Sequence, residues 1–405
     1  MTVHTVLETL QRELTNELVH RILPYWSTQV VDERHGGFVG YISGDDVRHD
    51  EAPRGAILNA RILWTFSAAY RILRSRTYIT TLQRAAHYFG THFVDPLHGG
   101  VYWMVDATGE PLDVRKHVYA QSFAIYGCSE HYRATGEESS LHRAVAIFRL
   151  LERHAHDSLH GGYREAFGCE WAPLEDVRLS AEDSNEPKSM NTHLHVLEAY
   201  TNLARAWPDA LLRARLRSLV DIFVDRIADA DSHHVRLFFS DDWTPRSSSV
   251  SYGHDIEASW MLLAAVDVLR DDALRARVRP LCLNLANAVL TEGLDPAGGI
   301  FNESHPDGSV DTDKEWWPQA EAIVGFLNAF QETGQNVFLD AAGATWGFIR
   351  SHMLDMEHGE WHRRVARDGS VRPHREKVGP WKCPYHNARA CLEVMARVEA
   401  LLASR

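Results

Sequence analysis

Three histidines stand near the starts of three segments that have helical apolar spacing. The histidines and their segments are His195 in residues 188–200, His254 in residues 252–260 and His386 in residues 381–389. An imidazole titrates near neutral pH, so it can remove a proton from a substrate and also return it. If the three segments run in the same direction around one axis, their histidines converge. The sequence therefore predicts a proton-transfer site that draws on three separate helices.

A short turn element recurs along the chain and indicates how these segments are arranged. Its copies begin at an aspartate and most contain a Gly-Gly pair; they occupy residues 32–38, 95–101, 157–163, 295–300 and 355–361, with a degenerate copy at 231–239 that begins at Asp231. The copies recur about every sixty residues, a period typical of repeated units that stack on one another. Six units follow from this spacing.

Each unit adds two segments with helical apolar spacing. The first segments are apolar nearly all round, as expected of helices buried on both sides; they run 56–74, 117–135, 188–206, 254–270, 317–333 and 382–402. Second segments with one Arg-rich face run 139–155, 208–228, 272–291 and 337–353, and residues 3–26 supply the outer helix of the last unit. We therefore predict an all-α fold. It is a closed (α/α)6 barrel of one domain over residues 1–405, with short β-hairpins and loops over the mouth where the inner helices begin.

The polar and aromatic residues at the starts of the inner segments outline the site. They are Asn59, Arg61, His117, Tyr119, Gln121, Asn191, His193, His195, His254, Glu257, Trp316, Trp317, Gln319, Glu321, Trp381, Tyr385 and His386. One histidine on an apolar helix is more often a hydrogen-bonded core residue, but three at equivalent positions favour a function. Arg61 in an apolar helix must find an anion or several oxygens. His193 lies two residues from His195, so it points elsewhere, and we expect it to be structural.

This set of residues suits one kind of chemistry better than others. It has no Ser-His-Asp order, no phosphate-binding glycine loop and no zinc motif. Proton abstraction next to a carbonyl needs a base, a donor that stabilises the enediolate, and an acid on the opposite face if the configuration inverts. The N-termini of the inner helices and Arg61 would supply positive charge to the enediolate. These residues fit an aldose epimerase or isomerase.

At this point the motifs match a known family. The strings that carry the resemblance are Arg54-Gly-Ala-Ile-Leu-Asn-Ala-Arg-Ile-Leu-Trp64, Lys116-His-Val-Tyr-Ala-Gln-Ser-Phe123, Met190-Asn-Thr-His-Leu-His195, Gly253-His-Asp-Ile-Glu-Ala-Ser-Trp260, Trp316-Trp-Pro-Gln-Ala-Glu321 and Pro384-Tyr-His-Asn387. Over essentially its whole length the chain resembles the N-acylglucosamine 2-epimerase superfamily, and within it the enzymes that epimerise cellobiose.

The resemblance implies an isomerase that acts on sugars without a metal or organic cofactor. It would invert C2 of the reducing-end glucose of β-1,4-linked disaccharides such as cellobiose and lactose, giving mannose, by ring opening and proton transfer through a cis-enediolate. His254 and His386 would be the acid/base pair, and His195 would assist at O1 and O2. Glu257 would hold His254 in its tautomer.

The resemblance also implies where the sugar binds. Arg61, Tyr119 and Asn191 would hold the oxygens of the reacting sugar, and indole faces would stack on the sugar rings. The loops 173–187 and 303–314 should touch the non-reducing sugar. The residues assigned to substrate binding are Arg61, Tyr119, Asn191, Trp316, Trp317, Trp381 and Asp183.

Several alternatives remain open at this point. A mannose 2-epimerase or aldose–ketose isomerase acting on free monosaccharides would keep the same acid/base set. A glycoside hydrolase would need two carboxylates, such as Glu257 with Glu321 or Asp183. A sugar-binding protein without activity would have no use for three mouth histidines. A metal-dependent isomerase is disfavoured, because Asn191, His195, His254 and Asp255 lack a coherent ligand spacing.

The bulk composition limits the partners and the compartment. The net charge is -13 without clustered Lys or Arg, which argues against a nucleic-acid or anionic-membrane partner. We find no apolar run of signal-peptide or membrane-spanning length. The five cysteines show no CxxC spacing, as expected for buried thiols in a reducing compartment. We expect a cytoplasmic monomer whose partner is a small sugar.

Overall fold

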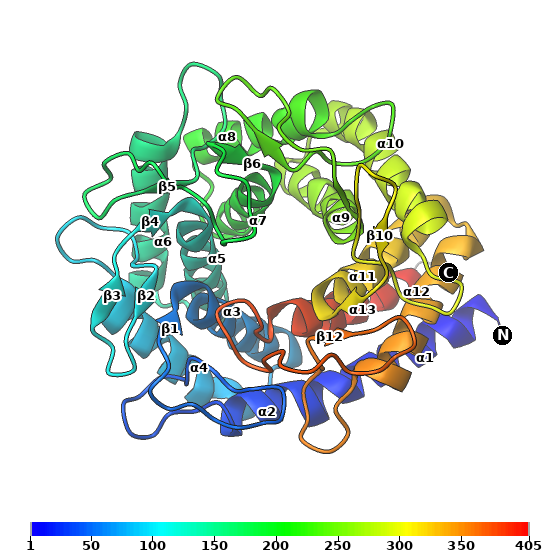
Figure 1. Ribbon diagram of the computed structural model, residues 1–405, viewed down its shortest axis with the longest axis horizontal. Helices are drawn as coiled ribbons and strands as arrows, with labels where there is room; N and C mark the ends of the chain where they lie inside the picture. Colours follow the sequence, from blue (N-terminus) through cyan, green and yellow to red (C-terminus); the bar gives the residue numbers. More distant parts are fainter. Residues whose placement is uncertain (1, 404–405) are drawn as a thin grey trace.

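The computed structural model describes residues 2–403, and its helices form two concentric rings (Figure 1). The inner ring consists of α3 (Ala56–Leu73), α5 (Val118–Thr135), α7 (Met190–Ala206), α9 (Tyr252–Leu269), α11 (Trp316–Thr333) and α13 (Tyr385–Ala403). The outer ring consists of α1 (Val3–Glu17), α2 (Leu23–Thr28), α4 (Ile79–Tyr88), α6 (Glu138–Leu150), α8 (Ala210–Ile222), α10 (Asp272–Ala288) and α12 (Asn336–Phe348). Each inner helix packs against the next, and α13 packs against α3 and α1. The prediction of a closed (α/α)6 barrel is confirmed.

The inner helices begin close to where the apolar pattern predicts. The last one starts at Tyr385, directly after Pro384, rather than at residue 382. Glycines let the inner helices approach one another closely. A Cβ on Gly127 of α5 would lie 2.7 Å from the Ala60 carbonyl oxygen of α3. A Cβ on Gly325 of α11 would lie 2.8 Å from the Ile256 carbonyl oxygen of α9, so larger residues at either position would push the helices apart.

The outer segments contain wider turns that the sequence pattern does not predict. The apolar spacing runs on through these segments, but the last five residues of the α4, α6, α8, α10 and α12 segments before the mouth loops are π-helical, and a further π turn joins α1 to α2. These turns are η1 (Leu18–Ile22), η3 (Phe89–Phe93), η4 (Leu151–Ala155), η5 (Phe223–Ile227), η6 (Val289–Gly293) and η7 (Ile349–Met353), and a short 3-10 turn, η2 (Arg76–Tyr78), precedes α4. One extra residue in the turn shifts the helix face without a break, and π turns of this kind are otherwise rare.

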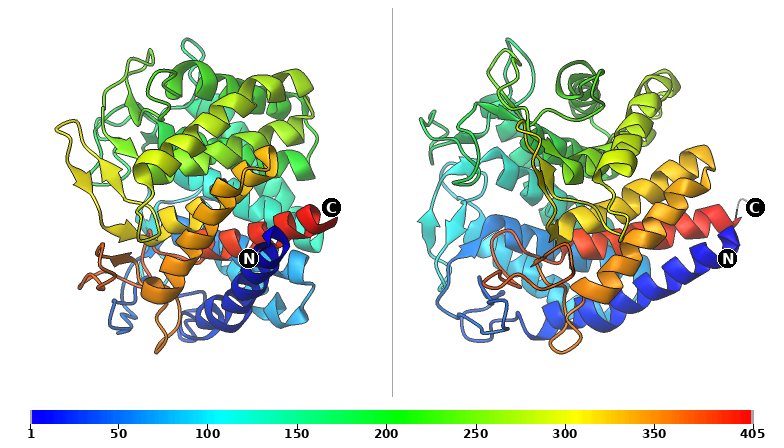
Figure 2. Two further views of the ribbon diagram at one scale, coloured as in Figure 1. Left: turned by 90° about the vertical axis from the view of Figure 1, so that its right-hand side faces the viewer. Right: turned by 45° about the vertical axis from the view of Figure 1, so that its right-hand side comes forward.

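Short strands join neighbouring units around the mouth. The strands are β1 (Arg54–Gly55), β2 (Met104–Val105), β3 (Pro111–Asp113), β4 (Lys116–His117), β5 (Ala166–Phe167), β6 (Lys188–Ser189), β7 (Phe238–Phe239), β8 (Val250–Ser251), β9 (Glu303–Ser304), β10 (Val310–Asp311), β11 (Lys314–Glu315) and β12 (Arg364–Val365). The strand before an inner helix pairs antiparallel with a strand of the next unit, as β4 does with β5. A bridge between Ile42 and Val378 links the first unit to the last. Figure 2 shows these strands and loops gathered at one end of the barrel, away from the two termini.

The aspartate of the repeated turn accepts backbone hydrogen bonds within the turn and also pairs with a buried cation. In the third copy, Asp157 accepts hydrogen bonds from the backbone N–H groups of Leu159 (2.9 Å) and His160 (3.2 Å). Its other oxygen lies 2.8 Å from the Nζ of Lys188, which is fully buried in β6 next to α7. The equivalent pairs are Asp32–Arg54, Asp95–Lys116, Asp295–Lys314 and Asp355–Lys377. Each pair ties a turn to the chain that enters an inner helix.

The fourth copy of the turn begins at Asp229 and not at Asp231. The N–H of Asp229 donates to the carbonyl of His234 (2.8 Å), just as the N–H of Asp157 donates to Gly162 (2.9 Å). His233 and His234 occupy the places of the two glycines, and His233 has a positive φ of 61°. The sequence assignment was shifted by two residues because the glycines that mark the other copies are missing here.

No helix among residues 2–403 combines the length and the apolar character needed to cross a bilayer.

We predict that replacing Lys188, the buried lysine that pairs with the aspartate of the third turn, destabilises the barrel strongly. In Lys188→Met, the carboxylate of Asp157 stays buried without its cation, which typically lowers the free energy of unfolding by about 3–5 kcal/mol. Urea unfolding followed by circular dichroism measures this. The control is Arg178→Met, whose pair with Asp176 is exposed, so its change should stay within about 1 kcal/mol. Equal effects of the two substitutions would contradict the prediction.

Candidate active site

A cavity of about 390 Å³ opens at the mouth of the barrel, where the inner helices begin. It is lined by every residue to which the sequence analysis gave a catalytic or substrate-binding role: Arg61, Tyr119, Asp183, Asn191, His195, His254, Glu257, Trp316, Trp317, Trp381 and His386. The loop 173–187 contributes Leu179 to Asp183, as expected of a loop over the mouth. The remaining lining residues are Asn302, Glu303, Glu315, Arg363, Arg364 and Arg375. The convergence of the three histidines is therefore observed.

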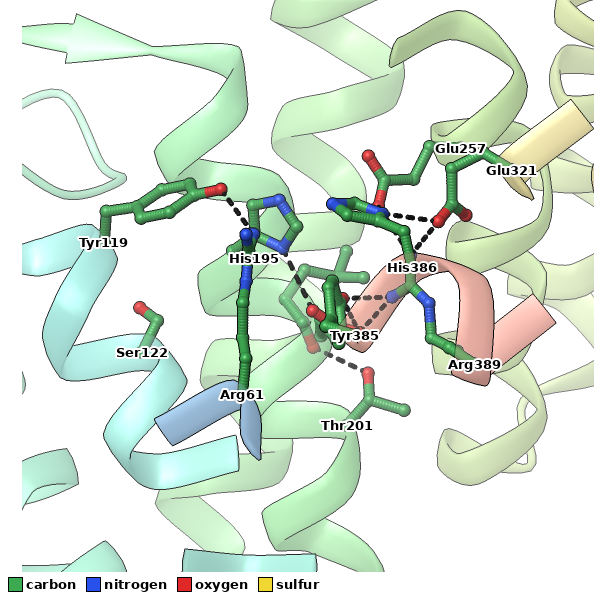
Figure 3. A network of polar contacts seen from close by, with 12 residues as sticks. Arg61, Tyr119, Ser122, His195, Thr201, Glu257, Glu321, Tyr385, His386 and Arg389 are labelled. Carbon is green, nitrogen blue, oxygen red and sulfur yellow. Dashed lines mark hydrogen bonds and ion pairs between the residues drawn. The ribbon is translucent and has the colours of Figure 1, made fainter. Parts of the chain in front are cut away.

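Two of the histidines are each hydrogen-bonded to a carboxylate. The Nδ1 atom of His386 lies 2.7 Å from Oε1 of Glu321, and the Nδ1 atom of His195 lies 3.0 Å from Oε2 of Glu198 (Figure 3). An ionised carboxylate can only accept a hydrogen bond, so it favours the tautomer with the proton on Nδ1. The Nε2 atom of each ring is then left with a free lone pair, as a base requires.

Burial keeps these two imidazoles neutral. Removal from water lowers the pKa of His386 well below its usual value, and the charges of Arg61 and Arg389 lower it further. Burial likewise lowers the pKa of His195, against the opposing effect of Glu198. A neutral imidazole at neutral pH can accept a proton without first losing one.

His254 is held differently from what the sequence suggested. Its Nδ1 atom lies 2.9 Å from Oγ of Ser251, three residues earlier. Glu257 does not orient this ring, since its Oε1 bonds Arg389 at 2.6 Å. Burial lowers the pKa of His254 to about 3, and the neighbouring His195 contributes. The prediction that Glu257 holds His254 is therefore wrong. Glu257 turns toward α13, where it bonds Arg389.

Arg389 connects the two histidine–carboxylate pairs beneath the cavity. Its Nη2 atom lies 2.6 Å from Glu257 and 2.7 Å from Glu321. Its Nη1 atom contacts Glu198 and the hydroxyl of Tyr385. Figure 3 shows Arg389 beside Tyr385 and the two glutamates Glu257 and Glu321. The sequence analysis gave no role to Glu198 or Arg389. The one available signal was a charged residue in an apolar helix, the same signal that singled out Arg61.

The carboxylates around Arg389 differ in their protonation. Burial acts against the charge of Glu198, but Arg389 and His195 lower its pKa to about 2, so it stays ionised. Burial raises the pKa of Glu257 and of Glu321, and the negative charge of Glu321 raises that of Glu257 further. One guanidinium cannot neutralise three carboxylates, so Glu257 and Glu321 share a proton near neutral pH.

Arg61 lies on aromatic rings at the side of the cavity. Its guanidinium carbon is 4.1 Å from the Phe123 ring centroid and 4.7 Å from that of Tyr385. One amino group donates to the Tyr119 hydroxyl at 2.9 Å, and the other lies 3.7 Å from the sulfur of Cys383. No carboxylate neutralises it directly within the described chain, so its charge is available to an oxygen anion in the cavity.

Indole rings and unpartnered polar atoms form the rest of the lining. The Trp317 ring lies 4.8 Å from the His254 ring and 5.6 Å from the His386 ring, measured between centroids. Trp381 packs edge to face with Tyr119 at 6.0 Å. Oδ1 of Asn191 and Nε1 of Trp316 are buried and have no partner in residues 2–403. Such atoms are the expected partners of ligand hydroxyls, since buried polar groups are rarely left unpaired.

Other polar residues at the helix starts are structural. His193 lies outside the cavity lining; it accepts a hydrogen bond from the N–H of Tyr163 at 2.8 Å and donates to the Ser189 carbonyl at 2.6 Å. This confirms the structural role expected of it. Gln121 and Gln319 each bond both backbone groups of the residue that follows the Gly-Gly pair. These side chains fix the hairpins over the mouth.

One group of residues could in principle ligate a metal ion. Potential ligand atoms of Glu257, Glu321 and His386 lie within 4.8 Å of one another. Arg389 already lies on both carboxylates, so its positive charge competes with a cation there. The set also lacks the spread of oxygen and nitrogen ligands around an open position that catalytic metal sites have.

Comparisons with known proteins agree with this geometry. The model of the N-acylglucosamine 2-epimerase (GlcNAc 2-epimerase) family matches residues 36–390. A cellobiose 2-epimerase of Bacteroides fragilis is 47% identical over 389 residues, which cover 96% of this chain and 99% of that protein. One of Dictyoglomus turgidum is 38% identical and covers 97% and 100%. The structure of the cellobiose 2-epimerase from Bacillus thermoamylovorans superposes with a TM-score of 0.93 at 38% identity, over 96% of this chain and 100% of that one.

We predict that Arg389→Met destabilises the barrel and abolishes activity together. The substitution leaves buried carboxylates without a cation, which should lower the free energy of unfolding by about 3–5 kcal/mol. Denaturant unfolding measures it. Arg350→Met is the control, because its pair with Glu13 is more than half exposed on the arginine side and should contribute less than about 1 kcal/mol. A variant at position 389 with wild-type stability would refute the view that this arginine holds the floor of the site.

Proposed function

We propose that this chain, which belongs to the N-acylglucosamine 2-epimerase family, is a disaccharide 2-epimerase. It interconverts glucose and mannose at the reducing end of β-1,4-linked disaccharides such as cellobiose and lactose. The observation that carries this proposal is the set of three histidines in one cavity, two of them held by carboxylates through Nδ1. The near full-length similarity to cellobiose 2-epimerases supports the same substrate class.

The proposed reaction replaces the proton at C2 of the open-chain sugar. Nε2 of His386 removes the C2 proton, and the electron pair forms a cis-enediolate between C1 and C2. His254, which has taken up a proton from the solvent, donates it to the opposite face of C2, so the configuration inverts, and His386 releases its proton to the solvent. The two histidines exchange roles in the reverse direction. Trp317, which contacts both rings, holds them at the sides of the reacting carbon. His195 assists at O1 and O2.

The positive charges of the site stabilise the enediolate. Arg61 carries a charge with no carboxylate partner among residues 2–403, and the inner helices direct their N-termini toward the cavity. Arg61, Tyr119 and Asn191 bind the oxygens of the reacting sugar. The negative charge of the enediolate also favours protonation of the neighbouring imidazoles, so His254 can serve as an acid despite its low pKa.

The second sugar has space beside the reacting one. A neighbouring cavity of about 330 Å³ shares Asp183, Asn191, His254 and Glu303 with the first. Asp183 and the loop around it would contact the non-reducing sugar, and Trp316, Trp317 and Trp381 would stack on the rings. A mannose 2-epimerase would use the same acid/base set without needing this space. The similarity to cellobiose 2-epimerases favours the disaccharide.

A glycoside hydrolase is disfavoured by the positions of the carboxylates. Hydrolysis needs two carboxyl groups on opposite sides of the scissile bond. Glu257 and Glu321 both bond the same nitrogen of Arg389, so they lie next to each other on one side of the cavity. Asp183 comes from the loop above, where Ser180 holds it.

We also propose that the whole of residues 1–405 acts as one catalytic domain, as a monomer in the cytoplasm and without a cofactor. The free thiols support a reducing compartment, since four of the five cysteines are buried and none forms a disulfide in the described chain. Light scattering of the purified protein and activity after chelator treatment test the monomer and the absence of a metal.

We predict that the chelator-treated protein, incubated with cellobiose in D2O, forms a mannose-ended disaccharide with deuterium at C2. His254→Asn and His386→Asn should each lower the rate about 10²–10⁴-fold, the usual contribution of a general acid or base. NMR of the anomeric and C2 signals follows both events. The exposed His20 provides the control, and His20→Asn should react at the wild-type rate.

Two other results would change the proposal. Release of free glucose would indicate a hydrolase. Reaction with free mannose but not with cellobiose would keep the proton transfer and replace the substrate.

A further inference from the structure

Only one of the three carboxylates bound to Arg389 lines the cavity. Glu257 lines the cavity at the mouth, whereas Glu198 and Glu321 do not. Glu321 is engaged by the Nδ1 of His386 and by the Nε1 of Trp260, at 2.7 and 3.1 Å. One oxygen of Glu257 bonds Arg389, and its second oxygen has no hydrogen-bonding partner in residues 2–403. It is therefore free to act on a ligand.

Of the two glutamates that share a proton, Glu257 holds it, because Glu321 accepts a hydrogen bond from Nδ1 of His386. Three carboxylates share one guanidinium below the cavity, and Glu198 retains its charge because it bonds His195, Tyr385 and Arg389. Burial and the neighbouring Glu321 raise the pKa of Glu257. A buried carboxyl group kept neutral in this way can donate a proton at neutral pH.

The proposed epimerase needs such a donor before any C2 chemistry. A reducing sugar is a closed ring without an acidic C2 proton, so the C1–O5 bond must break first. The departing O5 requires a proton, and the hydroxyl at C1 must lose one. In the proposed mechanism, His254 and His386 act at C2 and His195 at O1, which leaves O5 without an acid.

We propose that Glu257 is the general acid that opens the pyranose ring, an inference that rests on the proposed epimerase function. The O1 proton passes to Nε2 of His195, and the electron pair of the O1–H bond forms the C1 carbonyl. The C1–O5 bond breaks, its pair moves to O5, and O5 takes the proton of Glu257. Ring closure returns both protons, so the sum of the two steps is balanced. Protonated His195 then faces O1, where enediolate charge develops.

Two substrates separate ring opening from proton transfer at C2. The first is cellobiose; the second is its analogue in which the reducing unit lacks O5, so that it cannot close a pyranose ring. In D2O, Glu257→Gln should lower epimerisation of cellobiose about 10²–10⁴-fold. The same variant should wash deuterium into C2 of the open-chain analogue at close to the wild-type rate. Glutamine keeps an oxygen for Arg389, so the fold is retained.

Glu321→Gln is the matched comparison, because it alters the other carboxylate on the same nitrogen of Arg389. It should slow exchange into both substrates, since Glu321 holds the base His386. Asp183→Asn tests a second carboxyl group that lines the cavity, from the loop on its opposite side. The proposal would be overturned if Glu257→Gln lowered the rate equally on both substrates, or if this variant epimerised cellobiose at the wild-type rate. It would also be overturned if Asp183→Asn, and not Glu257→Gln, lost activity on cellobiose alone. If the wild type washes no deuterium into the open-chain analogue, the epimerase mechanism itself fails, and the assignment of Glu257 fails with it.

Discussion

The ion cluster around Arg389 is the interaction on which the site depends. One guanidinium on α13 bonds carboxylates from α7, α9 and α11, so four of the six inner helices meet at a single buried charge. Isolated charges at that depth would be strongly unfavourable, and each carboxylate is tolerated only because the cation and further hydrogen bonds satisfy it. The same bonds set the height and the rotation of the helices relative to one another. The histidines one turn above are positioned as a consequence.

The repeated turns hold the barrel from outside this cluster. A buried aspartate–lysine or aspartate–arginine pair ties most turns to the strand before an inner helix. The unit that leads to α9 departs from this rule, with Asp229 paired to Arg236 instead. In that unit His234 bonds Asp255 of α9 at 2.7 Å. The start of α9 is thus secured by a different contact, and it carries His254, the histidine without a carboxylate.

The electrostatics of the cavity follow from burial combined with fixed positive charge. Arg61 and Arg389 both lower the pKa of His386, so the imidazoles are neutral before a sugar binds. The same charges stabilise an enediolate when it forms. Within the cluster around Arg389, Glu198 and Glu321 orient histidine rings and do not line the cavity. Glu257 is the member of this cluster that lines the cavity, and we assign it a separate chemical role.

The sequence by itself determined the barrel and identified the inner-helix residues that line its cavity. The sixty-residue repeat and the apolar spacing are local patterns, and residues near the starts of parallel inner helices must share one mouth. What it could not determine were contacts between helices. Glu198 and Arg389 are 191 residues apart, and no spacing rule links them.

The tertiary structure alone decided which neighbours bond. Two glutamates follow a histidine by three residues. Glu198 bonds the histidine of its pair, His195. Glu257 does not bond His254; it bonds Arg389, and His254 bonds Ser251. Spacing along a helix establishes only that two side chains are able to meet. Which partner each one takes depends on charges that other helices bring to the same depth, because a buried charge must be neutralised wherever the fold places it.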